Sequence, residues 1–166
     1  MSMPSISITR CFDAGAVVYL LMSSMARRTY IGCAWQSPAP WRRCAQHNGV
    51  ESGGVERLAS GRPWHVACFV HGFTNHLVAL QFEAAWQRGF RHASMRYVSR
   101  FTPSRGALGK VELLIALLKT PAWWPLRLRV HVVHSVPLVD QHERVRVERW
   151  LFALRSFSYV TRGPHW

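Results

Sequence analysis

Two short segments, each carrying a tyrosine, place the strongest constraint on how this chain can fold. Residues 16–22 are apolar, begin with β-branched valines and contain Tyr19, which indicates a buried strand. Residues 28–35 mix Thr, Tyr and Ile with small residues and contain Tyr30, which indicates a second strand. Residues 23–27 are expected to form the turn between them. The sequence therefore predicts a hairpin that brings both tyrosines onto adjacent strands.

The rest of the chain predicts a small α/β unit in which helices flank a three-stranded sheet, mixed or antiparallel. Periodicity, cap and turn residues predict a helix over 41–46 with a left-handed cap at Asn48-Gly49, and then a long mobile loop over 51–62. A strand over 64–70 and a helix from Asn75 to about 87 are expected next. Three further elements are predicted: a helix over 111–119, a strand over 127–133 with one solvent-exposed (wet) face, and a final helix near 147–157. We expect a loose extension over 1–12, a folded domain over 13–100, and a C-terminal appendage of helices and a strand over 101–166.

The charge of the chain indicates a polyanionic partner. Twenty-one basic residues face eight acidic ones, giving a formal net charge of +13 over 166 residues. Such an excess opposes a compact state unless a polyanion shares the surface. Nucleic acid is the first choice, with an anionic membrane second. The longest apolar runs, 14–22 and 111–118, are too short to span a bilayer, so no membrane partner is expected.

Cysteine spacing argues against a zinc site or a disulfide framework. Cys11, Cys33, Cys44 and Cys68 form no C-x-x-C pair, so we expect reduced thiols and no structural zinc. The first 28 residues are poor in acids and rich in serine, as in a transit peptide. Because Tyr19 lies within this stretch and belongs to the proposed site, we discount that interpretation.

Five residues together could catalyse metal-assisted cleavage of a phosphodiester: Tyr19, Tyr30, Arg43, His47 and Glu83. Opening the bond requires water activation, neutralisation of charge on the transition state, and stabilisation of the leaving oxygen. Arg43 and His47 are four residues apart and share one helix face. Glu83 can hold one divalent cation whose shell is completed by water.

Each residue also has a structural interpretation. A strand tyrosine is more often a packing residue, a lone histidine is more often structural than catalytic, and Arg43 alone would be a solvated helix residue. Glu83, beside Trp86, is the least expected, because a buried carboxylate without a partner is costly. The order and spacing of the five residues together indicate catalysis more strongly than any one of them does alone.

In these residues the chain resembles the GIY-YIG endonuclease superfamily. Val18-Tyr19-Leu20-Leu21 is similar to the GIY element, with Val17-Val18 replacing Gly-Ile, and Thr29-Tyr30-Ile31-Gly32 matches the YIG element. A narrower branch, the catalytic subunit of the eukaryotic endonuclease that resolves Holliday junctions and cuts flaps, is similar in further segments: Arg42-Arg43, Gln46-His47-Asn48-Gly49, Gly53-Gly54, Ser60-Gly61-Arg62-Pro63-Trp64, Val70-His71-Gly72-Phe73, Ala79-Leu80-Gln81-Phe82-Glu83 and Lys119-Thr120-Pro121-Ala122-Trp123.

The resemblance implies a GIY-YIG nuclease domain over 13–100 and a role in DNA repair and recombination. It implies that Glu83 binds Mg²⁺ or Mn²⁺, that one tyrosine orients the water, that Arg43 stabilises charge, and that His47 positions the phosphate or relays a proton. It further implies a nuclear protein acting on branched double-stranded DNA; mitochondrial targeting by the N-terminus is the alternative. Five arginines are expected to hold the flanking DNA backbone: Arg27, Arg28, Arg42, Arg62 and Arg91.

Three features depart from that branch. Three residues are inserted around 37–40, and Leu58-Ala59 replaces a threonine that usually follows an arginine. The branch also has a C-terminal zinc-binding RING-like domain, whereas this chain has no cysteine after Cys68. Because that domain helps to bind a scaffold subunit, the resemblance implies such a partner less directly here.

Two other functions remain open from the sequence. The first is a catalytically silent module that binds branched DNA, against which the intact five-residue set argues. The second is a basic RNA-binding protein that stacks bases on its eight tryptophans. The tryptophans are spread over many elements, which favours core packing.

Overall fold

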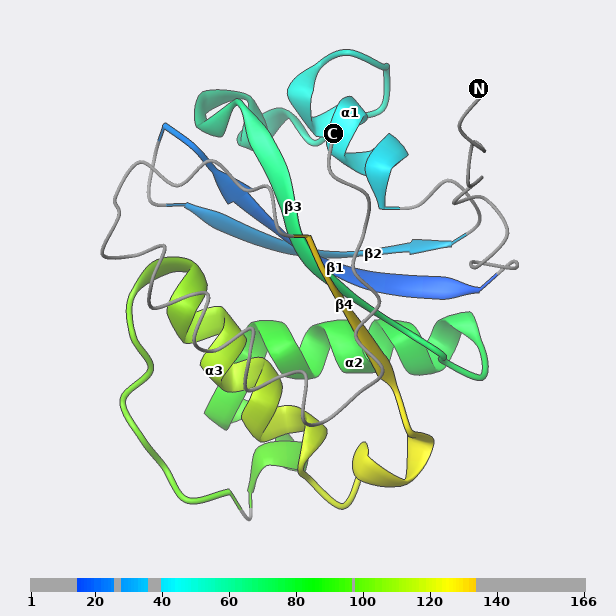
Figure 1. The fold of residues 1–166 in the computed structure, drawn as a ribbon, viewed down its shortest axis with the longest axis vertical. Coiled ribbons are helices and arrows are strands. Elements are labelled where there is room, and N and C mark those ends of the chain that lie inside the picture. Colours follow the sequence, from blue (N-terminus) through cyan, green and yellow to red (C-terminus); the bar gives the residue numbers. More distant parts are fainter. Residues whose placement is uncertain (1–14, 26–27, 36–39, 97, 134–166) are drawn as a thin grey trace, which may run out of the picture.

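The computed structural model describes residues 15–25, 28–35, 40–96 and 98–133. Within them, a four-stranded sheet has the order β2-β1-β3-β4, and every neighbouring pair is antiparallel (Figure 1). The strands are β1 Ala16–Ser23, β2 Thr29–Trp35, β3 Trp64–His71 and β4 Arg129–Val132. The predicted antiparallel α/β fold is confirmed, and the sheet contains one strand more than the three expected.

Strand β1 is buried along its length because it lies inside the sheet with a covered face on each side. Val18 and Leu20 belong to one apolar cluster, whereas Val17, Tyr19 and Leu21 belong to the other. This two-sided burial explains why the strand is an unbroken apolar run rather than an alternating one. The hairpin register places Tyr19 opposite Gly32.

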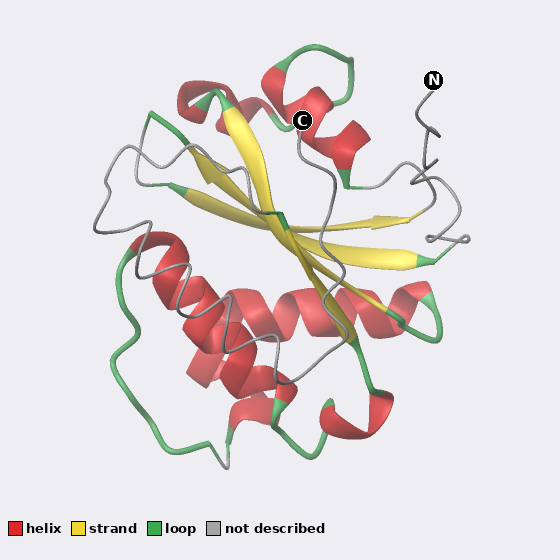
Figure 2. Ribbon diagram, viewed as in Figure 1, coloured by secondary structure: helices red, strands yellow, loops and turns green. Residues whose placement is uncertain are grey.

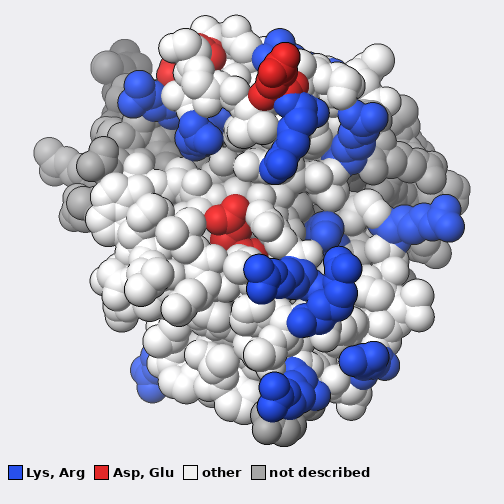
Figure 3. All heavy atoms as spheres, turned by 180° about the vertical axis from the view of Figure 1, so that it is seen from behind, with Lys and Arg blue, Asp and Glu red and all other residues white. Residues whose placement is uncertain are grey.

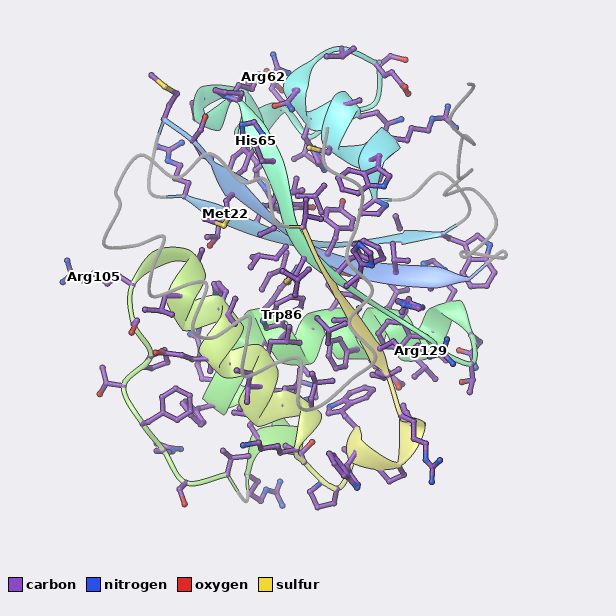
Figure 4. The ribbon with its side chains drawn as sticks, viewed as in Figure 1. Met22, Arg62, His65, Trp86, Arg105 and Arg129 are labelled. Carbon is purple, nitrogen blue, oxygen red and sulfur yellow. The ribbon has the colours of Figure 1, made fainter. Side chains whose placement is uncertain are left out.

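Helices cover both faces of the sheet (Figures 1 and 2). Helix α1 (Trp41–Asn48) and the 3-10 helix η2 (Glu56–Gly61) lie on one face, and α2 (His76–Arg88) and α3 (Gly106–Leu118) lie on the other. Three further single-turn 3-10 helices complete the described part: η3 Gly89–Arg91, η4 Ala93–Met95 and η5 Trp124–Leu126. Trp86 points from α2 into the core and donates from its Nε1 to the Lys110 carbonyl, which ties α2 to α3 (Figure 4).

The cap residues act as the sequence predicts. Gly49 ends α1 at a φ of 80°, in the left-handed region that glycine adopts without strain. Asn75 begins α2 by accepting a hydrogen bond from the Val78 amide through its Oδ1 at 3.0 Å. The loop expected over 51–62, in contrast, contains η2.

Strand β4 corrects one expectation. The alternation over 127–133 predicted a wet face, but His131 is only 7% exposed and its ring stacks on Phe69 at 4.8 Å. Both faces of β4 are therefore covered beyond Arg129. Histidine is treated as polar when alternation is read from a sequence, but its imidazole ring can pack on an aromatic ring, so the alternation does not require a solvent-exposed face.

Helix α3 packs in the same apolar core as the preceding elements, and strand β4 pairs with β3 in the same sheet. The division at residue 100 stays a prediction. The extension over 1–12 and the final helix near 147–157 lie outside the described residues. None of the helices described here is long and apolar enough to cross a bilayer.

Candidate active site

Four of the five predicted catalytic residues come together on the α1 face of the sheet. Tyr19 of β1 and Tyr30 of β2 have ring centroids 6.3 Å apart, and the Tyr30 and His47 rings lie 5.1 Å apart. The Tyr19 hydroxyl lies 3.4 Å from His47 Nε2. Arg43 is close enough to Tyr19 to influence its ionisation. The two strands and α1 therefore meet at one polar cluster.

Gly32 makes this close packing possible. A Cβ at Gly32 would lie 2.6 Å from the Tyr19 hydroxyl oxygen and 2.8 Å from Tyr30 Cε1. Real Cβ atoms do not approach other heavy atoms so closely. The glycine thus provides the space into which both tyrosine rings extend.

His47 is fully buried, and its hydrogen bonds define its tautomer. Its Nδ1 accepts from the Val55 amide at 3.3 Å, so the proton of the neutral ring resides on Nε2. Nε2 therefore donates toward the Tyr19 oxygen. Burial, with a smaller effect of the Arg43 charge, lowers the pKa of His47 to about 4. The imidazole is neutral at physiological pH.

Arg43 is fixed by bonds to its surroundings. Its guanidinium donates to Gln46 Oε1 at 2.7 Å and to the Gly53 carbonyl at 3.3 Å. Burial raises the pKa of Tyr19 well above its ordinary value, and hydrogen bonding to Arg43 offsets only part of this rise. Tyr19 therefore keeps its proton at neutral pH, while its oxygen faces donors from His47 and Arg43.

Glu83 lies on α2, over the opposite face of the sheet, and is held toward the edge strand β2. Gln87 Nε2 donates to Glu83 Oε1 at 2.9 Å and to the Ile31 carbonyl at 3.0 Å. Half-burial raises the pKa of Glu83, an effect that the Gln87 hydrogen bond and the His76 charge reduce. Burial is the main cause of the raised pKa values of Tyr19 and Cys33, and the Glu83 charge adds to both, so the carboxylate acts electrostatically across this edge.

The donor set fits a hard divalent cation held by one carboxylate. Among the residues that the structure describes, no group of three or more His, Cys, Asp or Glu side chains could enclose a metal ion. Mg²⁺ commonly keeps several waters and binds through one or two carboxylates plus a substrate phosphate. Glu83, with one oxygen fixed by Gln87, suits this arrangement.

The predicted DNA-contacting arginines lie on different parts of the surface, and Arg27 lies outside the described residues. Arg28 donates to Ser60 Oγ at 2.7 Å, and Arg42 pairs with Glu51 at 3.2 Å. Arg62 donates from Nε to the His47 carbonyl at 2.8 Å, so it stabilises the end of α1. Arg91, in η3, is exposed.

Two further residues at the site were not predicted from the sequence. Gln87 binds both the carboxylate and the edge strand, as described above. The exposed Arg57 lies over the Tyr30 ring, with its guanidinium carbon 5.9 Å from the ring centroid. The i, i+4 spacing of Glu83 and Gln87 could have indicated the first contact. No sequence signal indicates the second.

One face of the molecule combines these charges. In Figure 3 one acidic group lies near the centre of the view, and basic side chains gather above and below it. With this arrangement, basic side chains could bind the phosphates of a polyanion while the carboxylate between them holds a cation against one phosphate.

The chain matches a known family over half of its length. Residues 15–97 match the family described as the GIY-YIG catalytic domain. This region contains all five predicted catalytic residues and the hairpin that carries both tyrosines. The chain therefore belongs to the GIY-YIG family.

Several relatives share a more particular name. The structure-specific endonuclease subunit slx1 of Schizosaccharomyces japonicus is 42% identical over 133 residues, which cover 74% of this chain and 48% of that protein. The protein of this name from Phaeosphaeria nodorum is 46% identical, covering 84% of this chain and 37% of its own length. The Schizosaccharomyces pombe protein is 34% identical, covering 66% and 42%. This chain thus spans less than half the length of these relatives.

Proposed function

We propose that this chain is a structure-specific DNA endonuclease that hydrolyses phosphodiesters at branched DNA, including 5′-flaps, replication forks and Holliday junctions. The observation that carries the proposal is the meeting of Tyr19, Arg43 and His47 beside Tyr30 of β2, with Glu83 held toward the same strand from the other face of the sheet. Similarity to proteins named as structure-specific endonuclease subunits supports it.

In this proposal Glu83 would hold Mg²⁺ or Mn²⁺ at the scissile phosphate. The cation would supply charge neutralisation and lower the pKa of a water. Gln87 restrains the carboxylate by bonding to Oε1, so Oε2 would be the oxygen that binds the cation.

The residues on the α1 face bind and orient the phosphate. Because His47 Nε2 donates to the Tyr19 oxygen, the Tyr19 hydroxyl proton is available to a phosphate oxygen or to the attacking water. Arg43, fixed by Gln46, offers positive charge to the non-bridging oxygens as charge develops. Tyr30, only partly buried beside His47, carries the second hydroxyl that can contact water or phosphate.

Flanking DNA would bind to the basic surface. Arg57 lies beside Tyr30 and would contact a phosphate there, and the exposed Arg28, Arg42 and Arg91 would contact other phosphates. Arg62 keeps its structural bond and offers only its terminal nitrogens. We further propose a nuclear protein that acts with a scaffold subunit, consistent with the word "subunit" in the relatives' names.

Cleavage of labelled 5′-flap and four-way-junction DNA tests this proposal. The full chain should nick near the branch with Mg²⁺ or Mn²⁺, and Glu83→Gln should remove nicking while still binding DNA. Glu56→Gln is the matched control, because it removes an equal charge from an exposed position on η2 and should leave nicking intact.

Other results would reject the catalytic assignment. Tight binding by parent and Glu83→Gln without cutting favours the silent DNA-binding module. Equal affinity for any single strand favours the RNA-binding alternative.

A further inference from the structure

An exposed strip of aromatic and apolar side chains adjoins Glu83 and takes no part in the chemistry above. It consists of Trp35 at the end of β2 and of His76 and Leu80 on α2, and we call it the edge strip. The Trp35 and His76 rings lie 5.3 Å apart at an interplanar angle of 44°. Trp35 is 44% exposed and Leu80 is 41% exposed, so both present apolar surface to the solvent beside Glu83.

The edge strip continues the line of the proposed active site. His76, Leu80, Glu83 and Gln87 have the spacing of one helix face. At one end of this face Gln87 bonds to Ile31, and at the other His76 packs against Trp35, so it runs along β2. Seven helical residues separate His76 from Glu83, a rise of about 10 Å.

We infer that the edge strip stacks an unpaired base of the DNA substrate, about three base steps from the phosphate held at Glu83. This inference rests on the proposed function and adds a binding site to it. Adjacent nucleotides in B-form DNA are about 3.4 Å apart, which converts the 10 Å rise into that number of steps. An exposed indole offers the flat surface on which any base can stack.

The surrounding charge favours a nucleotide over other occupants. Helix α2 contains one acidic residue, Glu83, so no second carboxylate on this helix repels a phosphate near Trp35. The whole chain carries +13, which draws polyanions to its surface. Bases in a continuous duplex keep their faces inside the stack, whereas an unpaired base at a branch exposes them. The edge strip would therefore distinguish branched from continuous DNA without reading base identity.

Binding of flap DNA that carries 2-aminopurine tests the inference. The full chain with Glu83→Gln, which prevents cutting, is titrated into 5′-flap DNA with the probe at each unpaired position next to the branch. An abasic flap and a continuous duplex serve as comparison substrates. Trp35→Ala should weaken flap binding about tenfold and remove the fluorescence change at one or two positions.

Matched variants isolate the indole. Trp35→Phe keeps an aromatic plane and should retain most of the fluorescence change. Trp124→Ala removes another exposed tryptophan, from η5, and should bind like the parent. Affinity for the continuous duplex and the abasic flap should change less than twofold in all three variants.

Several outcomes would overturn the inference. Unchanged flap affinity in Trp35→Ala, or an equal loss for flap and abasic flap, rejects base stacking. If sedimentation shows that Trp35→Ala without DNA has a different oligomeric state from the parent, the edge strip is a protein interface, and base stacking is rejected too.

Nicking assays with Glu83 restored separate this inference from the proposed function. Nicking by the parent together with unchanged flap affinity in Trp35→Ala rejects stacking alone. A Trp35-dependent 2-aminopurine signal without metal-dependent nicking supports stacking and rejects the catalytic assignment.

Discussion

Burial of His47 should make the free energy of unfolding depend on pH in a way that one substitution can isolate. The pKa of His47 is about 4 in the folded protein and about 6.5 when the ring is solvated. Because the folded state disfavours the proton, this stabilising contribution is fully present above pH 6.5 and is lost as the pH falls toward 4. Applying linkage to these two values gives a loss of about 2 kcal/mol between pH 7 and pH 5.

The measurement compares parent and His47→Asn by urea unfolding at pH 7 and pH 5, followed by tryptophan fluorescence. Asparagine cannot titrate in this range, so the variant should lose about 2 kcal/mol less than the parent between the two pH values. His71, with a pKa lowered to about 4 by burial, and Glu83, with a raised pKa, contribute to the pH dependence of both proteins. These shared contributions cancel in the difference.

A control changes an exposed side chain that does not titrate. Gln81→Asn, on the exposed face of α2, should leave the difference between pH 7 and pH 5 close to that of the parent. If His47→Asn and the parent lose equal stability, within about 0.5 kcal/mol, His47 is not held neutral by burial. The assignment of a protonated Nε2 donating to Tyr19 would then fail with it.

Three substitutions test the other contacts. Gln87→Ala should weaken Mn²⁺ binding to the DNA-bound protein about tenfold, as loss of an outer partner does at other metal sites, whereas the exposed Gln81→Ala should not; calorimetry in an uncut substrate checks this. Gly32→Ala should cost about 1–3 kcal/mol in urea unfolding, because its Cβ displaces both tyrosine rings; wild-type stability would refute the packing. Arg43→Lys should slow cleavage about a hundredfold while DNA affinity changes less than threefold, because the ammonium lacks the further planar N–H donors that the guanidinium can offer to phosphate while its Nη1 bonds to Gln46 and Gly53; equal losses in cleavage and binding would make Arg43 a binding residue.

Local patterns were sufficient to predict the hairpin and the capped helices. Buried β-branched and aromatic runs gave the strands of Tyr19 and Tyr30, and Asn75 marked the beginning of α2. These features depend on residues close together in the sequence. The five-residue set already grouped Tyr19 with His47, twenty-eight positions away, but the geometry of their contact comes from the structure.

Contacts between distant segments were not predictable in the same way. The strand over 127–133 was expected, but its pairing with β3 requires about sixty intervening residues to fold back, and no local signal encodes that. The bond from Gln87 to the Ile31 carbonyl joins residues fifty-six positions apart. Arg62, which we expected only as a DNA contact, also binds the end of α1 through its Nε, and no local signal indicates that second contact.

The position of β2 at the sheet edge explains how so few acidic residues could serve a nuclease. Tyr19 and Tyr30 extend on the α1 face, whereas Glu83 approaches from α2 on the other face. A phosphate can reach groups from both faces only where no further strand intervenes, and within the described residues β2 is such an edge strand. Donors from one face and a cation from the other would then share one phosphate, so a second carboxylate is not required. Adding a strand beyond β2 would separate these groups, which is why we expect this edge to contact DNA directly.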